Sequence, residues 1–194
     1  MQVEPCIAFV LLCIQHFTQT RIATIDSFVV CFILWSVYFM VRWCRRDLWG
    51  TPLWKGLAEL GLSGLFMGLS IASKWTGCYA GVGLAVLFFW FLIRRFLEIR
   101  AAKRIPQEER SERETAAASA GIKRLGITVL CCFGFFVAVP LLIYYASYIP
   151  FFAASGGVSV SKIIRQCESM LSYHSQEGLG MDHYFYSPWY EWPF

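Results

Sequence analysis

The chain has 194 residues, of which 57% are hydrophobic and only 15% are charged, and its mean hydropathy is +0.52. Soluble domains carry about 25% charged residues, so this composition excludes an ordinary soluble domain and indicates a membrane protein. The formal net charge is +4, but the positions of the charges along the chain say more about the fold than their sum does. We expect no nucleic-acid partner.

Five apolar runs follow one another along the chain, and each predicts a membrane-spanning helix. A helix needs about 20 apolar residues to cross the bilayer. Helices are the default because a spanning segment must satisfy its own backbone hydrogen bonds. The predicted helices lie near residues 3–18, 25–41, 57–72, 76–93 and 125–148. We therefore predict an all-α membrane protein with about five transmembrane helices, whose transmembrane region covers residues 1–148.

Glycines and one proline within these runs predict how the helices pack. The spacings Gly64-x-x-x-Gly68 and Gly77-x-x-x-Gly81 permit neighbouring helices to approach closely, so we assign these glycines to packing and not to ligand binding. Pro140, inside the fifth predicted helix, favours a kink. Most of the eight cysteines lie in apolar runs and none forms a CxxC pair, so we expect neither a structural disulfide nor a zinc site.

The basic residues predict the orientation of the helices. The connection after the second predicted helix and the one after the fourth, residues 94–124, together hold or flank 13 of the 17 Lys and Arg residues. By the positive-inside rule this side is cytoplasmic. The N-terminus is then cytoplasmic, and residues 149–194 form an extracytoplasmic segment of a multi-pass cell-membrane protein. Residues 94–124 have the mixed charge of a solvated, partly helical linker, to which we assign no chemistry.

The same topology brings most of the remaining polar residues to the outer side. Arg21 and Asp26 lie in the first outer turn, in "TQTRIATIDSF", and Lys74 and Trp75 lie in the next, in "ASKWTG". Residues 149–194 include a predicted amphipathic helix that would lie on the outer membrane surface. Its apolar face has Val160, Ile163, Ile164, Cys167, Met170 and Leu171. The candidate polar and aromatic residues of this segment are Arg165, His174, His183, Trp189, Tyr190, Glu191 and Trp192.

Each of these candidates also has a purely structural explanation. Asp26 could cap the second predicted helix or pair with Arg21. Lys74 could extend to the membrane interface, and the tryptophans could be interface aromatics. The two histidines could be exposed loop residues, and their spacing fits no compact metal motif. Against these explanations, ionisable residues at membrane depth usually mark function.

Three segments, taken in order, carry a resemblance to a known family. They are "QTRIATIDSFVVCFILWSVYFM", "GLSIASKWTGCYAGVGLAVLFF" and "YHS…HYFYSPWYEWP". Their Arg-x4-Asp step, Lys-Trp-Thr-Gly turn and Ser-x-Trp-Tyr-x-Trp-Pro segment resemble the protein O-mannosyltransferase family, in its bacterial form. The resemblance covers about residues 15–194.

The resemblance implies a multi-helix integral-membrane glycosyltransferase of the GT-C type. Such an enzyme transfers mannose from a polyprenyl-phosphate carrier, similar to dolichyl phosphate, to Ser or Thr of proteins at the outer face. Transfer with inversion needs a base for the acceptor hydroxyl and groups that hold the departing phosphate. By the resemblance, Arg21, Lys74 and Arg165 bind the donor phosphate, and Asp26 supports catalysis by ion pairing or by holding a divalent cation. The carrier and sugar cavity would be lined by His174, His183, Trp189, Tyr190, Glu191 and Trp192.

The chain also departs from the family pattern. The acidic pair that supplies the base in the family has no counterpart here, and the family has further helices after the Trp-Pro segment. We therefore expect an internal fragment that is inactive alone. Two alternatives stay open: a related lipid-linked-sugar glycosyltransferase with a lipid or glycan acceptor, and a non-catalytic scaffold or transporter component. Helix centres nearly free of charge argue against an ion relay.

Overall fold

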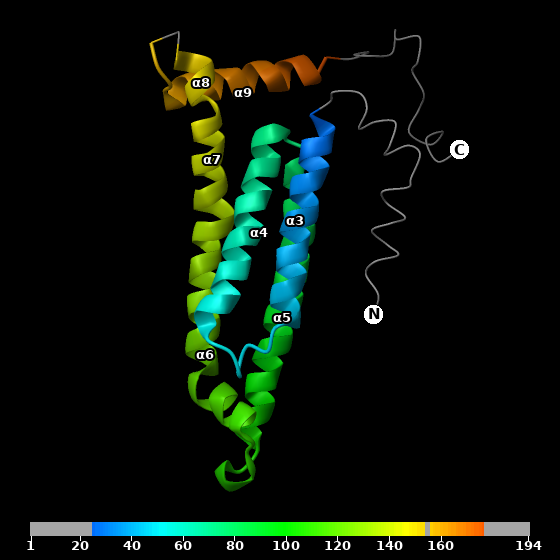
Figure 1. Ribbon diagram of the computed structural model, residues 1–194, viewed down its shortest axis with the longest axis vertical. Coiled ribbons are helices and arrows are strands. Elements are labelled where there is room, and N and C mark those ends of the chain that lie inside the picture. The colour runs from blue at the N-terminus through cyan, green and yellow to red at the C-terminus, as the bar shows by residue number, and fades with distance from the viewer. Residues whose placement is uncertain (1–24, 154–155, 177–194) are drawn as a thin grey trace, which may run out of the picture. The chain divides into compact units, whose positions relative to one another are not determined.

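The computed structural model describes residues 25–153 and 156–176, which form helices and no β-strand (Figure 1). The elements are α3 (Asp26–Arg45), α4 (Leu53–Ser73), α5 (Gly77–Arg104), the short 3-10 helix η1 (Gln107–Glu109), α6 (Glu112–Phe133), the π-helical segment η2 (Gly134–Ala138), α7 (Val139–Ser147), α8 (Ile149–Phe152) and α9 (Val160–His174).

Four helical segments among the described residues are long and apolar enough to cross a membrane. They are α3, α4, α5 and the run Glu112–Phe152. The prediction of an all-α membrane protein is thus confirmed. The first predicted helix, residues 3–18, lies outside the described residues, so the fifth span stays a prediction.

The helices extend beyond the apolar runs. α5 continues to Arg104 and α6 begins at Glu112, so most of the predicted linker over residues 94–124 is a helical hairpin. A capping box starts α6. Ser111 Oγ accepts a hydrogen bond from the backbone N–H of Glu114, and the Glu114 carboxylate accepts one from the N–H of Ser111 at 2.9 Å.

The α5–α6 hairpin holds the loop between α3 and α4. A buried cluster joins them, made of Leu48, Trp49, Ile99, Ala102, Ala117 and Leu125. Arg95 of α5 donates to the carbonyl of Arg46 at 2.6 Å, and Arg124 of α6 donates to the carbonyls of Leu48 and of Thr51, the latter at 3.1 Å. These bonds fix the loop to this end of the bundle, which we call the hairpin end.

Glu59 of α4 is buried near the hairpin end. Its carboxylate accepts hydrogen bonds from Arg42 at 3.2 Å and from Arg46 at 2.8 Å, and its side chain is only 6% exposed. The bond to Glu59 raises the pKa of Arg46 above its ordinary value. Two arginines thus neutralise the acidic residue that interrupts an apolar run, which explains how α4 tolerates it.

Reciprocal serine hydrogen bonds join α3 and α4 inside the bundle. Ser36 Oγ donates to the carbonyl of Ser63 at 2.8 Å, and Ser63 Oγ donates to the carbonyl of Ser36 at 2.9 Å. Both serines are buried. Small side chains such as serine allow helices to approach closely, and their hydroxyl groups find hydrogen-bond partners across the interface in apolar surroundings.

Glycines of α4 pack against η2 and the start of α7. A Cβ at Gly64 would overlap the backbone of Phe135, and a Cβ at Gly68 would lie 2.9 Å from Pro140 Cα. The predicted packing role of this glycine pair is therefore confirmed. Pro140 has no N–H to donate, and the irregularity that it predicts takes the form of the π-helical turn that precedes it.

The chain divides into two compact units, Met1–Tyr144 and Tyr145–Phe194. In the second unit α9 forms the helix that the apolar spacing predicted. Ile163 is its one buried residue, whereas Val160 and Ile164 are exposed. The position of α9 on a membrane surface stays a prediction.

Candidate functional site

Asp26 and Lys74 meet at one end of the first unit although 48 residues separate them. Lys74 Nζ lies 2.6 Å from Asp26 Oδ1, and the side chains are 45% and 46% exposed, respectively. Asp26 is the first residue of α3, and Lys74 directly follows α4. Because α3 and α4 are antiparallel, this Lys74 end of the bundle is opposite to the hairpin end.

The interpretation of Asp26 as a helix cap is wrong. The N-cap position of α3 is Ile25, and no side chain caps the helix there. Asp26 lies instead in the first turn of α3, where the helix dipole favours a carboxylate. Its carboxylate oxygen Oδ1 accepts a hydrogen bond from the ammonium of Lys74. The alternative partner, Arg21, lies outside the described residues.

The turn that carries Lys74 is packed so closely that its backbone is fixed. A Cβ at Gly77 would lie 2.5 Å from Ser70 Oγ and 2.8 Å from the carbonyl carbon of Ser70. The N–H of Lys74 donates to the Ser70 carbonyl at 3.0 Å, and Ser70 Oγ reaches the carbonyl of Val29 on α3 at 3.4 Å. The ammonium group is therefore held at the surface on a rigid base.

Trp75 ties the same turn to α7. Its indole Nε1–H donates to the hydroxyl of Tyr144 at 2.9 Å. The sequence pointed to Trp75 but not to Tyr144. The only feature of Tyr144 visible in the sequence is its polar phenol group near the end of the last apolar run. The turn between α4 and α5 is thus held from α3 through Asp26 and from α7 through Tyr144.

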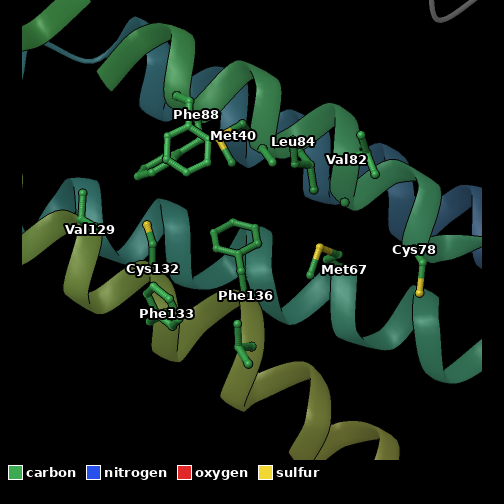
Figure 2. Close-up of a pocket in the computed structure, with 14 residues that line it drawn as sticks. Met40, Met67, Cys78, Val82, Leu84, Phe88, Val129, Cys132, Phe133 and Phe136 are labelled. Atoms are coloured by element: carbon green, nitrogen blue, oxygen red, sulfur yellow. The ribbon is translucent and has the colours of Figure 1, made fainter. Parts of the chain in front are cut away.

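An apolar cavity of about 470 Å³ lies among α3, α4, α5, α6 and η2 (Figure 2). Met40 and Met67 contribute from α3 and α4, and Phe136 contributes from η2. Its α5 wall begins at Cys78, whose N–H donates to the carbonyl of Trp75 at 2.9 Å. One end of the cavity therefore lies next to the turn that carries Lys74.

Comparison with protein families gives a match over residues 5–154, well over half of the chain, to the dolichyl-phosphate-mannose-protein mannosyltransferase family. The chain belongs to this family. Membership supports a mannosyltransferase-type function, a lipid-linked sugar donor and a membrane setting, and it confirms the resemblance found in the sequence. No curated protein and no solved structure matches the chain significantly.

The other predicted site residues of this mannosyltransferase-family chain are only partly described. Arg165 is exposed on α9, and His174 ends α9 with its ring 5.4 Å from that of Tyr173. Both belong to the second unit. The residues outside the described part of the chain are Arg21, His183, Trp189, Tyr190, Glu191 and Trp192. The roles that the sequence suggested for all of them stay predictions.

No group of three or more His, Cys, Asp and Glu residues that could hold a metal ion occurs in the part of the chain that the structure describes. Within that part, the partner of Asp26 is the ammonium of Lys74. The suggestion that Asp26 holds a divalent cation therefore stays a prediction.

Proposed function

We propose that the chain is part of an enzyme that transfers mannose from a polyprenyl-phosphate carrier to Ser or Thr hydroxyls of proteins on the extracytoplasmic face of the cell membrane. The family description includes both this donor class and a protein acceptor. The observation that carries the proposal is the exposed Asp26–Lys74 pair, opposite the arginine-rich hairpin end. By the positive-inside rule, the Lys74 end then faces outward.

The transfer reaction has a clear use for a fixed ammonium group. The bond between the anomeric carbon and the carrier phosphate breaks, and a bond from that carbon to the acceptor hydroxyl oxygen forms. The hydroxyl proton passes to a base, and negative charge develops on the departing phosphate. A positioned cation stabilises that charge. Lys74 has three N–H donors, of which Asp26 takes one, so two can reach phosphate oxygens.

Asp26 is best suited to position Lys74. A lysine ammonium sits on a flexible four-carbon stem, and a bond of 2.6 Å to Asp26 limits where it can point. Asp26 is engaged by that bond, which suits an orienting role better than proton removal. We therefore assign Lys74 to the donor phosphate and Asp26 to the support of Lys74.

The pair contributes little to the stability of the fold. Ion pairs between exposed side chains contribute about 0–1 kcal/mol, and both side chains here are about half-exposed. Substitution of either residue should therefore leave the helical bundle intact. Loss of transfer in such a variant would report on function and not on unfolding.

The test measures transfer of labelled mannose from polyprenyl-phosphate-mannose to protein, in membranes from cells that express the protein from its natural gene. Asp26→Asn and Lys74→Ala should each lower transfer by about tenfold or more at equal expression, and Lys74→Arg should retain more activity than Lys74→Ala. The matched control is Asp47→Asn, which breaks the similarly exposed pair with Arg113 at the hairpin end.

Two outcomes would contradict the proposal. If the Asp47 variant loses as much transfer as the Asp26 variant, the loss reflects general damage to the bundle. If labelled mannose enters lipid and not protein, the acceptor assignment is wrong and the related lipid- or glycan-modifying enzyme replaces it.

A further inference from the structure

The apolar cavity has the length and position of a slot for a chain-like ligand. Residues of α5 from Cys78 to Phe89 line it, and eleven residues of α-helix rise about 16 Å. In Figure 2 Cys78 and Phe88 lie toward opposite ends, and Met67 lies between them. The slot thus runs from the turn that carries Lys74 toward the middle of the bundle.

The lining of the slot selects a hydrocarbon. Its side chains are apolar, with thioethers from Met40 and Met67 and rings from Phe88 and Phe136. Figure 2 shows the ring of Phe136 projecting toward α5. Methionine side chains adapt their shape to irregular apolar neighbours, so this lining can follow a branched chain. A polar ligand would lose its hydrogen bonds to water here without replacement.

The rim of the slot opens along membrane-spanning segments. Val82 and Phe89 of α5 and Phe133 of α6 line the slot and are themselves exposed. All three lie within candidate spans, where the surroundings are lipid hydrocarbon and not water. A hydrocarbon chain can therefore enter sideways from the bilayer without crossing a polar layer.

The wall opposite α5 is a built feature and not a packing fault. Part of it comes from η2, where Phe136 and Val137 line the slot. The backbone of η2 is fixed from behind, because Phe135 rests on Gly64, which leaves no room for a Cβ. π-helical turns are frequent at functional sites.

We propose that this slot holds the Lys74-proximal isoprenoid units of the carrier lipid, with the carrier phosphate at Lys74. The inference rests on the proposed function and adds the place of the lipid tail. The occupant is an isoprenoid chain with an anionic head, because one end of the slot lies next to the turn that carries Lys74, and an ammonium group complements a phosphate. The family description gives dolichyl phosphate as the donor's lipid part.

The first experiment is photo-crosslinking in membranes with a polyprenyl phosphate that carries a diazirine in its first isoprenoid units and no sugar. We expect labels on the residues Val82, Ala85 and Phe136, located by sequencing the labelled peptides. Excess unlabelled polyprenyl phosphate should abolish this labelling, whereas an equal excess of phosphatidylglycerol should not. The proposal is wrong if Val86 and Trp90, which face outward on the same helix, are labelled equally, or if phosphatidylglycerol competes as well.

The second experiment fills the slot. Ala85→Phe places a ring in it, and Val86→Phe is the matched control, because Val86 is the next residue of α5, is exposed and does not line the slot. Slot labelling should fall about fivefold or more in Ala85→Phe and stay within about twofold in Val86→Phe. If Ala85→Phe does not fold, Val82→Trp at the rim makes the same test. Equal labelling in the slot-filling and control variants overturns the proposal.

The labelling result and the transfer result separate the two proposals. Labelled slot peptides without mannosyl transfer to protein would refute the proposed function and keep the slot. Transfer that proceeds without specific labelling of the slot would refute the slot and keep the function. In an active enzyme, Ala85→Phe should raise the KM for the polyprenyl-phosphate-mannose donor, whereas Val86→Phe should leave this KM unchanged.

Discussion

Replacement of Glu59 by Gln tests how the buried charge in α4 is held. The carboxylate accepts one hydrogen bond from Arg42 and two from Arg46, and Glu59→Gln keeps the shape but removes the charge. Removal of one partner of a buried pair costs about 3–5 kcal/mol. The arginine side chains are 49% and 20% exposed, respectively, and can recover part of their hydration. We therefore expect a loss of about 2–4 kcal/mol in the free energy of unfolding.

The two arginines should differ in a double-mutant cycle. Arg46 makes two bonds to Glu59 and is the more buried, so its coupling energy should be about 2 kcal/mol, whereas that of Arg42 should be below about 1 kcal/mol. Arg46 cannot relieve the loss of Glu59 by deprotonation, because a guanidinium stays charged in proteins. The variants compared are Glu59→Gln, Arg42→Gln, Arg46→Gln and the two double variants.

The assay is reversible unfolding of the purified protein in mixed micelles, with a denaturing detergent and circular dichroism as the signal. A loss below about 1 kcal/mol in Glu59→Gln would show that this carboxylate behaves as an exposed group. Equal coupling energies for Arg42 and Arg46 would refute the argument from bond number and burial.

Three further predictions follow from other contacts. Gly64→Ala should lower the unfolding free energy by about 1–3 kcal/mol, because its Cβ meets the backbone of η2, whereas Gly126→Ala has open space and should be neutral or stabilising in the same assay. Tyr144→Phe removes the hydroxyl that holds the α4–α5 turn, so mannosyl transfer should fall by roughly threefold to tenfold, and unchanged transfer would show that the hydrogen bond does not position Lys74. Hydrogen bonds from Ser111 lower the pKa of Glu114, so the cap stabilises α6 above the ordinary carboxyl pKa and this contribution is lost as the pH falls through the lowered value. The protection of the first-turn amides of α6 against hydrogen exchange should therefore fall at acid pH in the wild type and be low already at neutral pH in Ser111→Ala, and equal protection in both at neutral pH would contradict this.

The fold was largely predictable because hydropathy reports directly on membrane crossing. The limits of the helices were not, because a helix continues wherever its backbone bonds are satisfied and not only where it is apolar. α5 passes from its apolar run into charged sequence up to Arg104, and there Ile99 and Ala102 are buried against α6 and the α3–α4 loop. The Ser111-x-x-Glu114 spacing was a readable signal for the start of α6.

The candidate site was predictable as a set of residues on one side, but not as a set of contacts. Charge counting placed Asp26 and Lys74 at the same side of the membrane. Their pairing depends on how α3 and α4 are rotated about their axes, and the hydrogen bonds between Ser36 and Ser63 are among the contacts that fix this rotation. The bond to Tyr144 depends on a helix far along the chain, and no local pattern in the sequence encodes it.

The π-helical turn also sets the angular phase of everything that follows it in its helix. Each α-helical residue advances about 100° around the axis, and a π turn takes up about one residue more than an α turn. Deletion of one residue within Gly134–Ala138 would restore a regular helix and swing Tyr144 by about 100°, away from Trp75. The π-helical turn therefore works as a rotational spacer, and the direction of the Tyr144 hydroxyl depends on a feature about one and a half helical turns earlier in the same helix.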